Sequence, residues 1–190
     1  MAGFEPPYVL AVDVGSSAVK AGLFDSQARS VEDTEVSVAH KQRVASDGTS
    51  EEAAGQILRA TENAMDLVLE KAGRLAGEIV GVGFDCMAST VLGVDAEGTP
   101  VTPVYTYADT RSAYDVERLK EELNVPTIYD RTGANQHTSY LPGRIRWLRR
   151  TNKELAANVD RYVDVSTYMY SRWFGRQNVK ASYCVSSWSG

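Results

Sequence analysis

The first part of the chain alternates between apolar runs and short polar turns. Residues 8–14 are strongly apolar, a Gly-Ser-Ser segment at 15–17 interrupts them, and residues 18–24 are apolar again. Two apolar runs joined by a short Gly/Ser turn predict a β-hairpin. After a second turn, the imperfect alternation of Val and Thr with charged residues predicts a third strand over residues 31–38.

From residue 54 the apolar positions recur at spacings of three and four. This spacing predicts an amphipathic helix, and Gly73 marks its C-terminal end. Thr49 and Glu52 stand three residues apart just before the run, so they are predicted to form a capping box at the helix start. The positions that follow this period are Ala54, Ile57, Leu58, Thr61, Met65, Val68 and Ala72.

The rest of the chain changes from strand patterns to helix patterns. Short β-rich runs predict strands at 79–84 and 90–94, followed by a polar turn at 95–98 and a segment that runs on from Val101 to Tyr107. Helical patterns follow at 111–123, 140–150 and 165–174, and Pro126, Gly133 and Pro142 are predicted to separate them.

Composition bounds the class of protein. A chain of 190 residues can bury one hydrophobic core, and neither a repeat nor a low-complexity linker marks an internal boundary. We therefore expect one domain, or a large piece of one. Apolar residues make up 43% of the chain and charged residues 24%, which favours neither disorder nor a fibrous fold.

Charge and cysteine content exclude several kinds of partner. The net charge of −5 argues against a nucleic-acid partner and against an anionic membrane surface. The basic segment at 144–150 alternates with apolar residues, so we interpret it as the solvated face of a helix rather than a phosphate-binding patch. Cys86 and Cys184 lack metal-ligand spacing, which predicts two reduced, mostly buried thiols. With no leader and no apolar run of about 20 residues, a cytoplasmic location is expected.

The segment from Asp13 to Ser17 carries the first candidate chemistry. It leaves an apolar strand, and a carboxylate at a strand end can hold a metal ion or its water shell. Gly15 lets the backbone approach an anion, and the hydroxyls and amides of Ser16 and Ser17 can bind phosphate oxygens. The same residue types are ordinary in any turn, so the pentapeptide alone leaves both interpretations open.

The wider run over residues 9–25 resembles the first phosphate motif of the FGGY carbohydrate kinases, a family of the actin-like ATPase superfamily. The resemblance implies an α/β, ribonuclease H-like (actin-like ATPase) domain with a mixed sheet and flanking helices. It implies ATP and Mg²⁺ as cofactors, with Asp13 as the catalytic residue on the magnesium side. Gly15, Ser16 and Ser17 would bind the phosphates, and Lys20 stands where the family often has a basic residue, although an exposed strand lysine is the alternative.

Two further stretches resemble sugar-contacting segments of that family. Residues 82–91 look like the strand and loop that touch substrate hydroxyls. Met87 and Ala88 match the Met-His pair of xylulokinase-like members, with alanine in place of histidine, and a buried apolar strand is the alternative. Tyr107, Asp109 and Arg111 are similar to the Trp-x-Asp-x-Arg signature and would contact substrate, although Asp109 and Arg111 can equally form a structural ion pair.

The resemblance continues to the end of the sequence. Residues 131–148 resemble the family's Thr-Gly turn, substrate loop and Lys/Arg-x-x-Trp-Leu helix, which places His137 and Tyr140 among the substrate contacts. Residues 163–169, followed by 181–190, resemble the stretch that ends in Ala-Ser-x-Thr-Gly-Leu in longer members. The match therefore runs from about residue 8 to residue 190.

The resemblance implies ATP-dependent phosphorylation of a small-molecule sugar or sugar acid, with a gluconate-like acid first and xylulose or ribulose second. In the family the general base and the nucleotide-binding domain lie further along the chain than Gly190. We therefore expect residues 1–190 to be an incomplete, truncated N-terminal domain without the C-terminal domain, inactive alone, with exposed edges that favour a homodimer. The alternatives are a non-catalytic sugar-binding or regulatory module and an Hsp70-like or actin-like ATPase.

Overall fold

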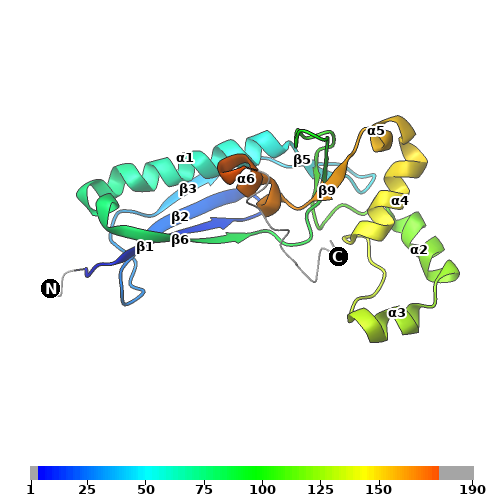
Figure 1. The fold of residues 1–190 in the computed structure, drawn as a ribbon, viewed down its shortest axis with the longest axis horizontal. Helices are drawn as coiled ribbons and strands as arrows, with labels where there is room; N and C mark the ends of the chain where they lie inside the picture. Colours follow the sequence, from blue (N-terminus) through cyan, green and yellow to red (C-terminus); the bar gives the residue numbers. More distant parts are fainter. Residues whose placement is uncertain (1–3, 176–190) are drawn as a thin grey trace. The chain divides into compact units, whose positions relative to one another are not determined.

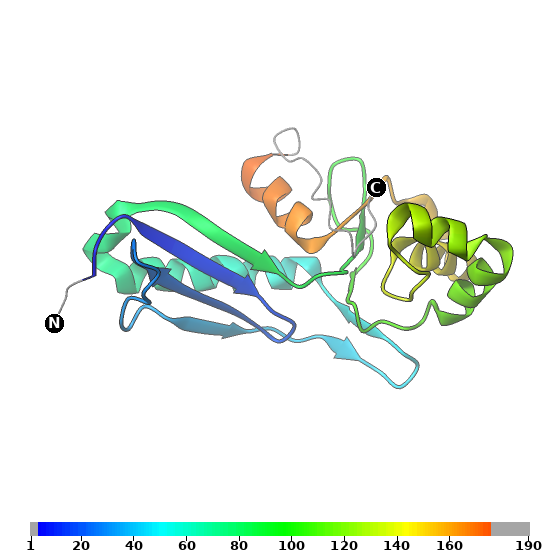
Figure 2. The ribbon, with the colours of Figure 1, turned by 90° about the horizontal axis from the view of Figure 1, so that it is seen from below.

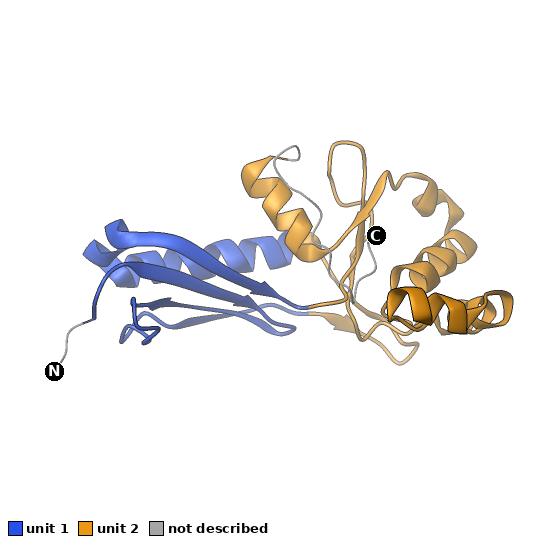
Figure 3. Cartoon of the chain, turned by 60° about the horizontal axis from the view of Figure 1, so that its bottom comes forward, with its two compact units in different colours: residues 1–41, 55–87 blue, residues 42–54, 88–190 orange. Residues whose placement is uncertain are grey.

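The computed structural model describes residues 4–175 and forms two compact units (Figures 1 and 3). Unit 1 comprises Met1–Lys41 and Gly55–Met87, and unit 2 comprises Gln42–Ala54 and Ala88–Gly190. The chain passes from one unit to the other through short connections rather than one long linker. A composition search for a Gly-, Pro- or Ser-rich linker therefore has nothing to detect.

Unit 1 is built on a four-stranded mixed sheet with the order β3-β2-β1-β6. β1 (Tyr8–Val14) pairs antiparallel with β2 (Ala18–Phe24), which confirms the predicted hairpin. β6 (Ile79–Cys86) lies parallel to β1 on its other side, and β3 (Val36–Ala39) is antiparallel to β2. Parallel pairing requires a crossover, which α1 provides.

The third strand begins later than the alternation predicted. Asp33 has a φ of 62°, in the left-handed region, which interrupts an extended strand. The Thr34 hydroxyl donates to the Val31 carbonyl at 2.7 Å and accepts from the Leu23 backbone N–H at 3.1 Å. Val31 keeps one backbone hydrogen bond to β2, from its N–H to the Leu23 carbonyl at 2.8 Å, and the Thr34 side chain replaces the strand pairing expected for the residues that follow.

The helix α1 (Ala54–Ala72) matches its predicted bounds and runs along the sheet of unit 1 (Figures 1 and 2). Its buried side chains are Ala54, Ile57, Ala60, Thr61, Ala64, Val68 and Ala72. Gly73, with a φ of 53°, follows the last helical residue and begins the short 3₁₀ helix η1 (Gly73–Glu78). The predicted capping box is wrong, because Glu52 belongs to a strand, β5 (Ser50–Glu52), that pairs with a distant part of the chain.

Two small antiparallel sheets form the strands of unit 2. One has the order β4-β5-β8, with β4 at Arg43–Val44 and β8 at Val104–Tyr105. The other pairs β7 (Leu92–Val94) with β9 (Arg161–Val163). The sequence analysis missed β4, β5 and β9, because strands of two or three residues are too short to show an alternating pattern.

The helices of unit 2 are α2 (Ala113–Glu122), α3 (Val125–Thr132), α4 (Leu141–Thr151), α5 (Lys153–Ala157) and α6 (Val165–Phe174). The patterns predicted α2, α4 and α6 and missed α3 and α5. Pro126 and Pro142 lie in the first turns of α3 and α4 instead of between helices, because a proline there gives up an N–H that has no helical partner. Gly133 ends α3 in the left-handed conformation.

The cysteines and the possibility of a membrane span were also considered from the sequence. Cys86 is half-buried at the end of β6, whereas Cys184 and the 181–190 match lie outside the described residues. No helix within residues 4–175 is long and apolar enough to span a bilayer.

Candidate functional site

Asp13 stands in a row of polar residues that crosses the sheet of unit 1. Its register partners are Lys20 on β2 and Asp85 on β6, and Lys20 in turn pairs with Ser37 on β3. Residues paired across neighbouring strands project from the same face of a sheet. The side chains of Asp13, Lys20 and Asp85 are exposed, whereas Val12 and Val14 on the opposite face of β1 are buried.

This row borders a cavity of about 850 Å³ that lies within unit 1. Small residues on the same face leave the space open beside the carboxylates. The lining residues that matter here are Ala11, Asp13, Lys20, Gly22, Gly83 and Asp85. Three carboxylates, those of Asp13, Glu35 and Asp85, and the ammonium group of Lys20 flank the cavity. Such a cavity can take a hydrated cation together with an anion.

The carboxylates beside this cavity fit magnesium better than a metal ion that takes all its ligands from protein side chains. No group of three or more His, Cys, Asp or Glu side chains in the described part of the chain could hold a metal ion. Magnesium usually keeps several water molecules and binds through one or two carboxylates and the phosphates of its substrate. Asp13 and Asp85 supply two carboxylates of this kind.

Asp85 is a residue that sequence analysis missed. It follows the strand predicted over residues 79–84 and was not assigned a function there, and its relation to Asp13 depends on the parallel pairing of β1 with β6, 72 residues later in register. A carboxylate at the end of a second apolar strand was the available signal. The pairing partner of that strand, however, cannot be read from the local pattern.

The β1–β2 turn, residues 13–17, is tight and leaves its hydroxyls available. The Gly15 N–H donates to the Ala18 carbonyl at 3.1 Å, and a Cβ on Gly15 would lie 3.1 Å from that same oxygen. Ser16 and Ser17 are exposed, and their hydroxyls form no hydrogen bond with the described part of the protein. The structure therefore places Gly15, Ser16 and Ser17 beside Asp13 and Lys20.

His40 holds this turn from the end of β3, and sequence analysis missed it. It is 8% exposed, and its Nε2 lies 3.0 Å from the Gly15 carbonyl oxygen. Its backbone N–H donates to the Ser17 carbonyl at 3.1 Å. Since a carbonyl only accepts, Nε2 carries the proton. A single histidine after an alternating strand gives no sign of this function in the sequence.

In unit 2, Asp109 and Arg111 form the structural ion pair that sequence analysis left as one of two alternatives. Asp109 is 3% exposed and accepts from the Ser50 backbone N–H at 3.0 Å. The Arg111 Nη2 lies 2.6 Å from Asp109 Oδ2 and 2.6 Å from Glu51 Oε2. Burial disfavours the charged guanidinium, but the hydrogen bonds that it donates to the two carboxylates outweigh burial and raise the pKa of Arg111.

Aromatic rings complete the surroundings of Arg111. Its guanidinium carbon lies 4.7 Å from the centroid of the Trp147 ring and 5.4 Å from that of Tyr105. A guanidinium over aromatic faces gains a cation–π attraction. Arg111 is thus engaged by protein groups on several sides, which suits a residue that holds a loop in place.

Arg144 corrects the interpretation of the basic segment as a solvated helix face. It is 3% exposed and donates only to backbone carbonyls: Nε to Thr138 at 2.9 Å, Nη1 to Ser89 at 2.9 Å and Tyr105 at 3.2 Å, and Nη2 to Thr106. Burial lowers the pKa of Arg144 to about 10. One side chain therefore joins three segments of unit 2 that are distant in sequence.

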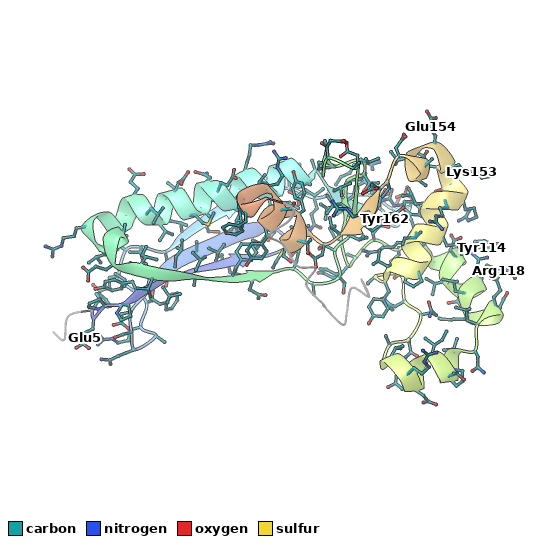
Figure 4. The ribbon with its side chains drawn as sticks, in the orientation of Figure 1. Glu5, Tyr114, Arg118, Lys153, Glu154 and Tyr162 are labelled. Carbon is teal, nitrogen blue, oxygen red and sulfur yellow. The ribbon has the colours of Figure 1, made fainter. Side chains whose placement is uncertain are left out.

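Arg146 and Arg150 of α4 contact α2, whereas Arg149 faces solvent. Arg150 Nη2 lies 2.8 Å from the buried carboxylate of Asp115, and Arg146 Nη2 donates to Glu122 at 2.9 Å. Tyr114, labelled on α2 in Figure 4, lies with its ring centroid 5.0 Å from the Arg150 guanidinium carbon. The basic segment thus joins two helices, and the prediction of a helix at this position is confirmed.

The remaining predicted substrate residues fall into both units. Tyr107 is 53% exposed, and the rings of His137 and Tyr140 lie 5.6 Å apart, all within unit 2. Ala88 is the exposed first residue of the 88–91 loop of that unit. Met87 instead ends unit 1, half-buried, where its backbone N–H donates to the Val14 carbonyl at 2.9 Å.

Comparisons with known proteins identify the family to which the chain belongs. Residues 8–187 match the N-terminal domain of the FGGY family of carbohydrate kinases. Gluconokinase of Bacillus subtilis (strain 168) is 26% identical over 188 residues, which cover 96% of this chain and 34% of that protein.

Solved structures show the same fold. Xylulose kinase from Rhodospirillum rubrum has a TM-score of 0.81 at 19% identity, covering 86% of this chain and 33% of that chain. Plasmodium falciparum glycerol kinase, solved with ADP, has a TM-score of 0.72 at 20% identity, covering 90% of this chain and 35% of that one. These likenesses and the mixed sheet confirm the predicted α/β, actin-like ATPase fold class. The chain spans about one third of the length of the relatives that it matches.

Proposed function

Because the chain belongs to the FGGY family of carbohydrate kinases, we propose that it forms part of an enzyme that transfers a phosphoryl group from ATP to a hydroxyl of a sugar or sugar acid. The observation that carries this proposal is the row of Asp13, Lys20 and Asp85 beside the β1–β2 turn, on the border of a cavity. Phosphoryl transfer depends on positioning and on electrostatic stabilisation, and this row offers groups for both.

Each group in unit 1 has a function in this proposal. Asp13 and Asp85 would hold magnesium through its water shell, and Lys20 would approach the phosphates as a positive charge. The amides and hydroxyls of the β1–β2 turn would donate to phosphate oxygens. Bound magnesium would neutralise charge on the phosphates. His40 would keep the turn in the conformation that these contacts need.

Unit 2 would bind the sugar. The exposed ring of Tyr107 offers an apolar face for a carbon chain, and His137 and Tyr140 offer polar atoms for hydroxyls. Asp109, Arg111 and Arg144 are committed to protein partners, so their contribution to the proposed function is to hold the loops. A gluconate-like acid is the first substrate candidate, supported by the gluconokinase relative, and xylulose or ribulose is the second.

The proposal also covers the behaviour of the 190-residue chain alone. We expect no sugar-dependent ATP turnover, because phosphoryl transfer in two-domain kinases needs a cleft that closes around both substrates.

The edge strand β6, with Val80 70% and Val82 56% exposed, supports self-association into a homodimer. A coupled turnover assay and sedimentation velocity measure these two properties. The location proposed for the activity is the cytoplasm, where ATP is supplied.

A thermal-shift screen tests sugar binding directly. The chain is melted with gluconate, xylulose, ribulose and glycerol, each with and without magnesium nucleotide. A ligand at 100 times its Kd stabilises the folded state by about 2.7 kcal/mol, which raises the Tm by about 5–10 °C in a chain of this size. Any additional shift that magnesium nucleotide produces in the wild type is expected to be lost in the Asp13→Asn variant, which should keep the sugar shift. No shift with any of the four sugars would contradict the proposal.

A further inference from the structure

Ser139 connects two loops that carry candidate sugar contacts. It is 8% exposed, and its Oγ donates to the Tyr107 carbonyl at 2.8 Å. Its backbone N–H lies within hydrogen-bond distance of His137 Nδ1, at 3.1 Å, and its Oγ lies 3.0 Å from the same nitrogen. One buried serine therefore touches both the His137 ring and the backbone of Tyr107.

These contacts determine which ring nitrogen of His137 carries the proton. The single hydroxyl proton of Ser139 goes to the Tyr107 carbonyl, which can only accept. If Nδ1 were protonated, the Ser139 backbone N–H would face another N–H group and lose its acceptor. An unpaired donor of this kind in a buried residue is strongly disfavoured. With Nδ1 as acceptor, each of these groups is paired.

We propose that Ser139 is a positioning residue that holds His137 as the tautomer with its proton on Nε2, and that this N–H donates to an oxygen of the sugar. Nε2 forms no hydrogen bond with any part of the chain that the structure describes, and His137 is an exposed residue. The ring also lies against Tyr140, with the ring planes 56° apart. A donor held in this way is available to an external acceptor.

The inference deepens the proposed function and rests on it, since it names the ligand chemistry of the sugar site. A fixed N–H donor selects an acceptor: a hydroxyl lone pair or, with a stronger charge-assisted bond, the carboxylate of a sugar acid. Because Ser139 also holds the Tyr107 carbonyl, the His137 donor and the backbone of Tyr107 keep a constant spacing. A fixed donor of this kind favours a sugar acid over a neutral sugar.

Long-range ¹H–¹⁵N correlation spectra of the ¹⁵N-labelled chain measure the tautomer. The sequence contains two histidines, and the His137→Gln variant assigns their signals. His40 is the internal reference, because its Nε2 donates to the Gly15 carbonyl. His137 is expected to show the same Nε2-protonated pattern as His40. A pattern with the proton on Nδ1, or an even mixture of the two tautomers, would overturn the proposal.

Two substitutions test the donor function. The amide nitrogen of glutamine reaches the place of Nε2, whereas that of asparagine reaches the place of Nδ1. In titrations with gluconate, His137→Gln is expected to weaken binding by about threefold and His137→Asn by about tenfold, the loss of one hydrogen bond. Equal losses in both variants, or a smaller loss in His137→Asn, would overturn the donor function.

Ser139→Ala separates the two contacts of the serine. It removes the hydroxyl and keeps the backbone N–H, so the Nε2-protonated pattern should remain while gluconate binding weakens by about fivefold. Ser139→Thr keeps the hydroxyl and should restore most of the affinity, and the Tm of each variant reports whether it folds. Unchanged binding in a folded Ser139→Ala variant would show that Ser139 does not position this site.

The spectrum and the titration fail independently. If the wild-type chain gives the Nε2-protonated pattern but no sugar binds in the titrations, the sugar-binding proposal and the donor function fail, and the positioning of the His137 ring stands. If sugars bind but the pattern shows Nδ1 protonated, the positioning fails and the proposed function stands.

Discussion

In unit 1 the candidate residues stand on regular strands, whereas in unit 2 they stand on loops that buried side chains hold. Asp13, Lys20 and Asp85 are brought together by the register of three paired strands. The positions of Tyr107 and His137 depend instead on hydrogen bonds with Ser139, and the Arg144 guanidinium donates to nearby backbone carbonyls. Backbone pairing tolerates changes in side chains. Variants of the exposed residues on the strands should therefore lose function while the protein keeps its stability. Variants at the anchors of the loops should lose stability first.

The largest expected effect is on activity in unit 1. If the proposed phosphoryl transfer is correct, Asp13→Asn should lower its rate by about 10²–10³-fold, because the substitution would remove a charge proposed to act on the metal-bound phosphates. The Tm should change little, since Asp13 is exposed. Steady-state kinetics and thermal melting measure the two quantities.

Asp85→Asn sharpens the same comparison. If the two carboxylates act together, this variant should also lower the rate, and extra magnesium should restore part of it. A normal rate in Asp85→Asn would restrict the metal-side function to Asp13.

The second effect is on stability in unit 2. Arg144→Met removes a buried guanidinium that satisfies carbonyls of three segments, and it should lower the free energy of unfolding by about 3–5 kcal/mol. Chemical denaturation followed by tryptophan fluorescence reports the loss. The matched control is Arg149→Met on the exposed face of the same helix, which should unfold like the wild type. Similar losses in both variants would contradict the anchoring function of Arg144.

The same contrast explains what the sequence could predict. The hairpin of β1 and β2 and the helix α1 follow from local periods, and both were predicted with correct bounds. Glu52 was assigned to a helix cap because its strand partner, Val104, lies far along the chain. A local sequence pattern cannot predict pairing with a residue so far along the chain.

The candidate site shows the same limit. Asp13 and the turn after it are contiguous, so they were found, while Asp85 depends on a parallel pairing that no local pattern reveals. Arg144 was expected to face solvent because an amphipathic pattern counts arginine as polar. Its carbonyl partners at Ser89 and Thr106 lie in other segments, so only the fold identifies it as buried.

A smaller effect on the kinetics is expected at His40. This residue belongs to unit 1, but it holds the β1–β2 turn through its side chain, as the anchors of unit 2 do. His40→Gln keeps a donor near the Gly15 carbonyl, whereas His40→Leu removes it. We expect His40→Leu to raise the KM for ATP by about tenfold, with a smaller change in kcat, and His40→Gln to recover most of the affinity. Equal KM values for the two variants would show that the donor does not matter to the turn.

The smallest expected effect concerns Tyr105, whose ring lies beside Arg111 in unit 2. Burial raises the pKa of Tyr105 from 10.0 to about 12, despite the nearby Arg111 charge, which acts in the opposite direction. The unfolded chain therefore loses this proton at lower pH than the folded chain. The stabilisation is complete below pH 10 and is lost as the pH rises towards about 12. Tyr105→Phe should flatten the fall in unfolding free energy over this interval, measured by denaturation at several pH values. If the two proteins lose stability in parallel, the Tyr105 hydroxyl does not ionise differently in the folded state, and the surroundings of Arg111 are more open than these contacts indicate.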